Sequence, residues 1–215
     1  MLPALAFTGF HNVGKTTLVR RVVSLLRERG YRVGVVKSTK HRDLFPEPPG
    51  KDTALYRGDG LELVALMEPE RAVLFWEGGP PLEELIFRLL GGWDLVVCEG
   101  FKESSLPKIE VVARAPDLER VLEEREHLLA VVWREPVEGM RTFSPQEPEA
   151  LADFVEETFL KGEWAALRIN GRSVYMKPFV ERVVVNTLMG LVGSLKGGEE
   201  AEKVELLLRV PRNKG

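Results

Sequence analysis

The stretch Gly9-Phe10-His11-Asn12-Val13-Gly14-Lys15-Thr16-Thr17 decides the fold of this chain. It follows a short apolar run and precedes a segment with apolar residues at helical spacing, which is the setting that a G-x-x-x-x-G-K-[ST] phosphate loop requires. Gly9 and Gly14 let successive backbone N–H groups point inward, so that they form an anion-binding nest at the start of a helix. The sequence therefore predicts a loop that binds the phosphates of a nucleotide.

The polar side chains of this loop have separate expected roles. Lys15 places a positive charge beside the β- and γ-phosphates, and the hydroxyl of Thr16 is a hard oxygen ligand for Mg²⁺. We expect the nucleotide to contact eight residues of the loop, namely Gly9, His11, Asn12, Val13, Gly14, Lys15, Thr16 and Thr17.

A second part of the site is expected at the end of the apolar segment 93–98. Glu99 follows this predicted buried strand directly, and a glycine comes after it. An acid at this place in a phosphate-loop protein positions Mg²⁺ or its waters, and the ligands of open α/β sheets bind at this edge. We therefore predict that Glu99 acts in catalysis and, with Thr16, in metal binding. Asp94, at the other end of the strand, is expected to be structural.

The segment 38–51 is rich in proline and glycine and cannot form a regular element. It is long for a structureless connection, which favours a functional loop. Asp52, at the start of a predicted short helix, is a third candidate catalytic residue beside Lys15 and Glu99. His41 and Asp43 are explained equally well by a function and by a solvated loop.

The order of elements predicts an α/β fold in three layers. A strand, the phosphate loop, a helix and a second strand follow one another within the first 37 residues, so these two strands should be parallel. Residues 1–161 are predicted to form a P-loop NTPase domain with a mostly parallel sheet. Residues 162–215 are predicted to form a small β-β-α-β unit, with an Asn170-Gly171 hairpin turn, a helix from Pro178 and a last strand over 203–210.

Composition excludes several classes of partner. The chain has 215 residues, is 44% apolar and carries a net charge of −3, which argues against nucleic acid or an anionic membrane as a general partner. No apolar stretch is long enough to cross a membrane. Cys98 is the only cysteine, so that a reducing, cytoplasmic location is expected. One cysteine and three dispersed histidines do not form a zinc ligand set.

Several motifs, in the same order along the chain, resemble those of the molybdopterin-guanine dinucleotide biosynthesis protein B family. They are the loop G-F-H-N-V-G-K-T-T-L, Lys37, His41 and Asp43 followed by Pro49-Gly50-Lys51-Asp52, and D-L-V-V-C-E-G-F-K over 94–102 followed by Lys108-Ile109. The resemblance covers roughly residues 3–160. Ser38 and Lys40 stand where the family has two histidines of a K-H-x-H-H-D stretch.

The resemblance implies a P-loop GTP-binding protein with weak Mg²⁺-dependent GTPase activity. Such proteins are commonly homodimers and assist the molybdopterin guanylyltransferase, which attaches GMP to molybdopterin. The residues alone predict a nucleoside triphosphate and Mg²⁺ and leave the base open, because no N-K-x-D signature lies in a usable place. Three alternatives remain: a small-molecule kinase or ligase that uses ATP, a metallochaperone GTPase, and a non-catalytic adaptor whose binding surface the nucleotide stabilises.

Overall fold

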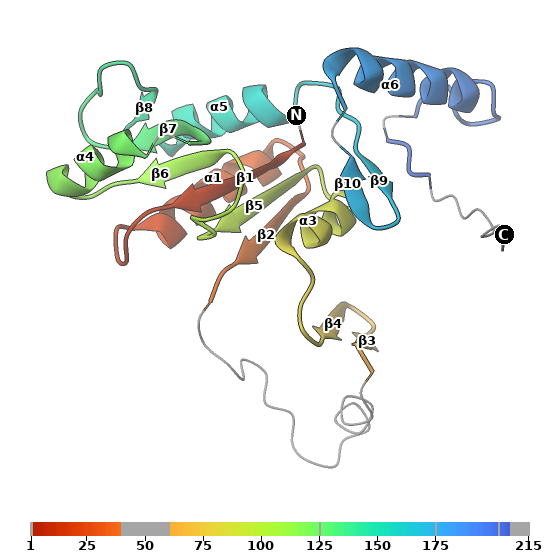
Figure 1. The fold of residues 1–215 in the computed structure, drawn as a ribbon, viewed down its shortest axis with the longest axis horizontal. Helices are drawn as coiled ribbons and strands as arrows, with labels where there is room; N and C mark the ends of the chain where they lie inside the picture. The colour runs from red at the N-terminus through yellow and green to blue at the C-terminus, as the bar shows by residue number, and fades with distance from the viewer. Residues whose placement is uncertain (1, 40–60, 125, 175, 202, 207–215) are drawn as a thin grey trace, which may run out of the picture.

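A computed structural model describes residues 2–39, 61–124, 126–174, 176–201 and 203–206. Its centre is a six-stranded sheet in the order β2-β5-β1-β6-β7-β8 (Figure 1). The strands are β1 (Ala4–Thr8), β2 (Val33–Lys37), β5 (Leu95–Glu99), β6 (Lys108–Val111), β7 (Leu128–Val132) and β8 (Thr142–Phe143). Every neighbouring pair is parallel, which confirms the predicted parallel sheet. The short β8 was not foreseen.

Helices cover both faces of this sheet, as the three-layer prediction required. They are α1 (Lys15–Glu28), α3 (Leu82–Leu90), α4 (Ala115–Glu123) and α5 (Pro148–Phe159). Side chains alternate between the two faces along a strand. Leu5 and Phe7 of β1 therefore pack with α1 and α5 in one core cluster, while Ala4 and Ala6 pack with α3 in the other.

The connections place the carboxyl end of β1 at a topological switch point, where successive strands are added on opposite sides of β1. From β1 the chain passes through α1 to β2 at the edge, returns to β5 beside β1, and then crosses to β6 on the other side of β1. Such a reversal of direction opens a crevice at the carboxyl ends of the strands, where ligands of open α/β sheets bind. The phosphate loop lies at this point.

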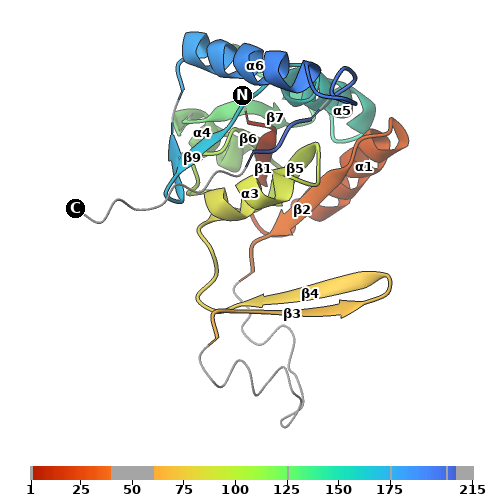
Figure 2. The same cartoon turned by 90° about the vertical axis from the view of Figure 1, so that its right-hand side faces the viewer.

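Two further strands form a hairpin outside the main sheet. β3 (Leu63–Glu68) pairs antiparallel with β4 (Arg71–Trp76), close to the strands predicted over 61–67 and 71–76. Two connecting residues are too few for a crossover, so the strands can only pair antiparallel. Figures 1 and 2 show the hairpin projecting away from the sheet. It exposes large apolar side chains, among them Met67, which is 84% exposed.

The predicted tail hairpin and helix are both present. β9 (Leu167–Ile169) and β10 (Arg172–Val174) enclose Asn170 and Gly171, whose φ angles of 51° and 78° are the positive values that a two-residue type I′ turn needs. α6 (Pro178–Gly193) follows and lies along the outside of the molecule (Figure 2). The division of the chain at residue 161 stays a prediction.

The last predicted strand, over 203–210, is wrong for the residues that are described. Residues 203–206 form no regular element, and the remainder lies outside the described residues. No strand in the described residues pairs with this segment, and the ammonium group of Lys203 donates a hydrogen bond of 3.2 Å to the carbonyl of Trp93. None of the helices in the described ranges has the length and apolarity needed to span a membrane.

Candidate functional site

The backbone of the phosphate loop adopts conformations that glycine makes possible. Gly9 has φ 143°, and a Cβ atom there would collide with the carbonyl oxygen of Val111 on β6. Gly14 has φ 87° and is the N-cap residue of α1, without a capping side chain. Gly14 thus gives the first N–H groups of α1 no side-chain acceptor, and a helix N-terminus of this kind favours an anion.

The Lys15 side chain folds back across the loop. Its Nζ donates a hydrogen bond of 2.8 Å to the carbonyl of Gly9 and another to the carbonyl of Phe10. Burial lowers the pKa of Lys15, while the nearby carboxylates of Glu99 and Glu110 act in the opposite direction. The ammonium group is thus held over the loop by two of the loop's own carbonyl groups.

Three side chains from three elements meet at the carboxyl ends of β2 and β5. Thr16, at the start of α1, donates a hydrogen bond of 2.5 Å from Oγ1 to Glu99 Oε1. Lys37, at the end of β2, places Nζ 3.0 Å from the same Glu99 oxygen and 3.3 Å from Thr16 Oγ1. The sequence predicted that Thr16 and Glu99 would be neighbours. It counted Lys37 with the charged loop that should reach the γ-phosphate, but it did not predict the contact between Lys37 and Glu99.

Opposing effects act on the carboxyl group of Glu99, a residue that is 8% exposed. Burial alone would raise its pKa, but the hydrogen bonds from Thr16 and Lys37 and the charges of Lys37 and Lys15 together lower the pKa below its ordinary value. Glu99 is therefore a carboxylate in the folded protein. A buried carboxylate beside a hydroxyl is a donor set that suits Mg²⁺, which takes few protein ligands and keeps phosphate oxygens and waters.

The remaining predicted residues lie in different surroundings. His11, Asn12 and Thr17 are exposed on the loop and the first turn of α1, and Val13 packs against the core cluster under α1. Asp52, with His41 and Asp43, lies outside the described residues. Asp94 accepts a hydrogen bond of 2.7 Å from the backbone N–H of Arg32, at the end of β5 away from the loop, as expected of a structural residue.

One buried polar pair beside the loop was missed by the sequence reasoning. The Thr8 hydroxyl at the end of β1 donates to Glu110 Oε2 on β6, and both residues are buried. Their strands are neighbours, and the register sets Thr8 opposite Glu110. The signal was a glutamate between Ile109 and Val111 in a strand predicted to be buried, because a charged residue is rarely buried without a partner.

The geometry defines the class of protein. A parallel sheet whose central strand leads through a G-x-x-x-x-G-K-T loop into α1, with Glu99 at the end of the adjacent strand, is the P-loop NTPase fold within the α/β class. The chain belongs to the molybdopterin guanine dinucleotide synthesis protein B family, whose model matches residues 4–134. That range contains every described residue of the site.

Individual relatives agree with this family. The molybdopterin-guanine dinucleotide biosynthesis adapter protein of Escherichia coli K12 is 33% identical in an alignment of 172 positions that covers 75% of this chain and 95% of that protein. A putative protein of the same name from Methanocaldococcus jannaschii is 23% identical in a gapped alignment of 235 positions that covers 96% of this chain and 97% of that protein. The structure of Bacillus subtilis MobB superimposes with a TM-score of 0.60 at 28% identity, covering 75% of this chain and all of that one.

Proposed function

We propose that this chain is a GTP-binding adapter of molybdopterin guanine dinucleotide biosynthesis, with weak Mg²⁺-dependent GTP hydrolysis. The observation that best supports nucleotide and Mg²⁺ binding is the 2.5 Å hydrogen bond between Thr16 and Glu99 beside the phosphate loop. It unites a hydroxyl that follows the loop lysine with a carboxylate on the neighbouring strand, which is the pair that P-loop proteins use beside Mg²⁺.

Each residue of the site has a proposed task. The loop backbone and the N-terminus of α1 bind the phosphates, and Lys15 neutralises the charge of the β- and γ-phosphates. Thr16 and Glu99 would hold Mg²⁺, which supplies charge neutralisation at the phosphate oxygens. Glu99, kept as a carboxylate, accepts hydrogen bonds from water at the terminal phosphate.

Two parts of this proposal depend on family membership. The guanine base and the biosynthetic pathway come from the family, since the described residues contain no N-K-x-D signature. We propose the molybdopterin guanylyltransferase as the protein partner, because the curated relatives bear the name of adapter proteins in that pathway.

We also propose that the chain is a homodimer. The β3–β4 hairpin supports this, because Leu63, Met67 and Leu74 are exposed by 52%, 84% and 61% on a short sheet that is separate from the main sheet in the part of the chain that the structure describes. Light scattering after gel filtration should give twice the mass of one chain. A monomer at micromolar concentration would contradict the proposed homodimer but would leave the proposed nucleotide binding and adapter function untouched.

The function is tested by reconstitution. Molybdopterin, GTP and Mg²⁺ are incubated with the guanylyltransferase, with and without this chain, and the dinucleotide product is measured over time. The chain should raise the rate of product formation, and Lys15→Ala should remove the gain. Lys196→Ala, at an exposed lysine of the tail, is the matched control and should behave like the wild type. An unchanged rate, without binding of the chain to the transferase, would contradict the adapter function.

A further inference from the structure

The outer face of α1 has no role in the proposed nucleotide site. The inner face of this helix is buried in the core, through Leu18, Val19, Val22 and Leu26. The outer face consists of exposed polar side chains, which are Thr17, Arg20, Arg21, Ser24, Arg27 and Glu28. At about 100° per residue, these positions fall within an arc of about 120° around the helix axis. Three arginines and one acid therefore share a single surface, which we call the arginine face.

The arginines of this face have no acid within reach on their own helix. Opposite charges stabilise a helix when they are three or four residues apart. The positions at these distances from Arg20, Arg21 and Arg27 hold threonine, serine, glycine, tyrosine and apolar residues. None of the three guanidinium groups forms a salt bridge or a hydrogen bond with another described residue. The one acid of the face, Glu28, accepts a hydrogen bond of 3.2 Å from Ser24.

Local stabilisation of α1 does not explain these arginines. The next arginine along the chain, Arg29, donates to Asp153 and Glu156 on α5, so it has a structural role. The helix dipole favours a cation in the last turn, where Arg27 lies. The other two arginines of the face lie in the second turn, where the dipole does not favour a cation. Their positive charge is therefore available to a partner.

The composition of the arginine face indicates the kind of partner that it fits. Helices that bind a membrane surface also present large apolar side chains, whereas the arginine face has none. Nucleic-acid binding rests on an excess of positive charge, whereas this chain has a net charge of −3. A guanidinium group can hold a carboxylate through two hydrogen bonds, and arginine is enriched in protein interfaces. An acidic protein surface is therefore the partner that the face fits.

We propose that the arginine face of α1 binds an acidic surface of the protein that this chain assists. Arg20, Arg21 and Arg27 pair with carboxylates of that protein. The same helix begins at Lys15, so the bound partner contacts the element whose N-terminus faces the phosphates. The choice of the guanylyltransferase as this partner rests on the proposed function.

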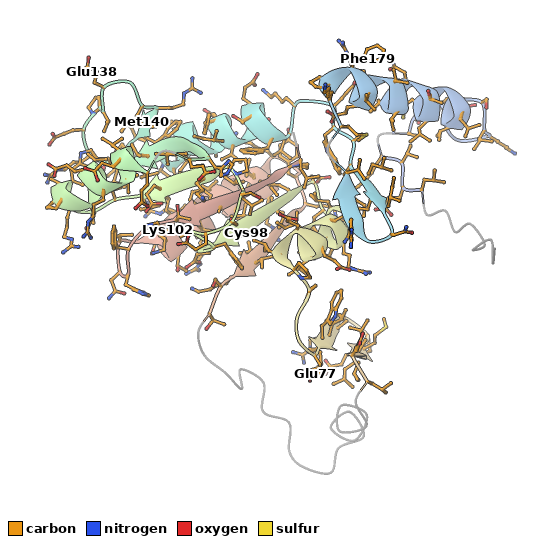
Figure 3. The ribbon with its side chains drawn as sticks, viewed as in Figure 1. Glu77, Cys98, Lys102, Glu138, Met140 and Phe179 are labelled. Atoms are coloured by element: carbon orange, nitrogen blue, oxygen red, sulfur yellow. The ribbon has the colours of Figure 1, made fainter. Side chains whose placement is uncertain are left out.

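Charge reversal on the arginine face, compared with charge reversal elsewhere, tests the proposal. The test variant reverses the three charges of the face, as Arg20→Glu, Arg21→Glu and Arg27→Glu. The matched control has the same net charge but reverses three exposed cations of the tail, as Arg172→Glu, Arg182→Glu and Lys196→Glu. The tail hairpin and α1 lie on opposite sides of the view in Figure 2, and Figure 3 labels Phe179 on α6.

Surface plasmon resonance measures how the guanylyltransferase binds each immobilised protein, with GTP and Mg²⁺ present, at low and at moderate salt. The test variant should bind at least about tenfold more weakly than the wild type, mainly through slower association, because charges at an interface steer the encounter. The association rate of the wild type should fall as salt rises, and that of the test variant should change less. The control variant should bind within about threefold of the wild type.

Four outcomes would overturn the proposal. Unchanged binding by the test variant would remove the arginine face and leave the adapter function standing. Equal weakening in the test and control variants would assign the effect to net charge. A wild type that does not bind the transferase would contradict the proposed adapter function and this docking surface together. A test variant that becomes monomeric in light scattering would show that the face contacts a second copy of this chain instead.

Two further variants separate the charge from the folding of α1, and circular dichroism checks that each remains helical. Lysine at all three positions keeps the positive charge, so this variant should bind the transferase within about threefold of the wild type. Glutamine at all three positions removes the charge and has a helix propensity close to that of arginine. The glutamine variant should bind with an affinity between those of the wild type and the test variant. Binding equal to that of the wild type would overturn the proposal.

Discussion

The ammonium group of Lys37 lies 3.0 Å from Oε1 of Glu99, which is the oxygen that also accepts the hydrogen bond from Thr16. The two residues stand directly opposite each other at the carboxyl ends of adjacent strands. A cation of the protein thus already contacts the hydroxyl and the carboxylate that the proposed function assigns to Mg²⁺. The two cations would compete for the same oxygen atoms.

Replacement of Lys37 should therefore favour the metal. We expect Lys37→Met to lower the Mg²⁺ concentration needed for half-maximal GTP binding, by up to about tenfold, because the carboxylate is no longer paired with an ammonium group. Calorimetric GTP titrations at several Mg²⁺ concentrations measure this shift. A higher Mg²⁺ requirement in Lys37→Met would mean that Lys37 assists the bound state instead.

The Glu99 carboxylate is expected to serve hydrolysis more than binding. Glu99→Gln keeps the shape and a hydrogen-bond acceptor for Thr16 but removes the charge. We expect GTP affinity within about threefold of the wild type and a hydrolysis rate at least about tenfold lower, since general-base and metal-positioning groups contribute this much or more. Phosphate release under saturating GTP is the measurement, and an undiminished rate would remove Glu99 from catalysis.

Gly9 should be intolerant of any side chain. In Gly9→Ala the new methyl group would meet the Val111 carbonyl, and φ 143° is a conformation that alanine rarely adopts. We expect Gly9→Ala to lower the free energy of unfolding by more than about 2 kcal/mol. Gly14→Ala is the matched control, because its Cβ would meet no atom and only the cost of a positive φ, about 1 kcal/mol, remains. Urea denaturation measures how much free energy of unfolding each variant loses. A smaller loss in Gly9→Ala than in Gly14→Ala would contradict the close packing of the loop on β6.

An ionic contact between α1 and α5 should give stability that depends on pH. The Arg29 guanidinium donates to Glu156 and Asp153 at 2.5 and 2.6 Å, and the Tyr31 hydroxyl donates to Glu156 at 3.0 Å. The hydrogen bond from Arg29 is the main reason that the pKa of Glu156 lies below its ordinary value of 4.5. The stabilisation is complete above that value and is lost as the pH falls through the lowered pKa of the folded protein.

The difference in unfolding free energy between the wild type and Glu156→Gln should therefore be largest near neutral pH and should shrink as the pH falls below 4.5, the ordinary pKa of a glutamate. Glu157→Gln, one position along on an exposed ion pair with Lys161, is the control and should show a smaller difference. Denaturant titrations across the acidic range measure both. A difference that does not change with pH would show that the contact acts through packing alone.

Much of the fold was predictable because its signals are local. The loop 9–17, the helix after it and the Asn170-Gly171 turn are each encoded within a few consecutive residues. Glu99 was predictable because a parallel strand that ends on an acid brings this acid to the edge where the loop lies.

The rest depended on contacts between distant segments. Lys37 meets Glu99 only because β2 and β5 are adjacent with this register, which no local pattern reveals. Glu110 finds Thr8 across β1 and β6 for the same reason. The predicted strand over 203–210 was apolar enough, but no neighbouring strand pairs with residues 203–206. Tertiary context overrides local preference at such positions.

Calorimetric titration of GTP and of ATP, each with Mg²⁺, into the wild type, Lys15→Ala and Lys196→Ala tests the central claim most directly. The account predicts that GTP binds in preference to ATP, that Lys15→Ala loses binding while remaining folded, and that Lys196→Ala binds as the wild type does. Preferential binding of ATP would contradict the guanine assignment and favour a small-molecule kinase or ligase. GTP binding that survives in Lys15→Ala would contradict the phosphate loop as the nucleotide site.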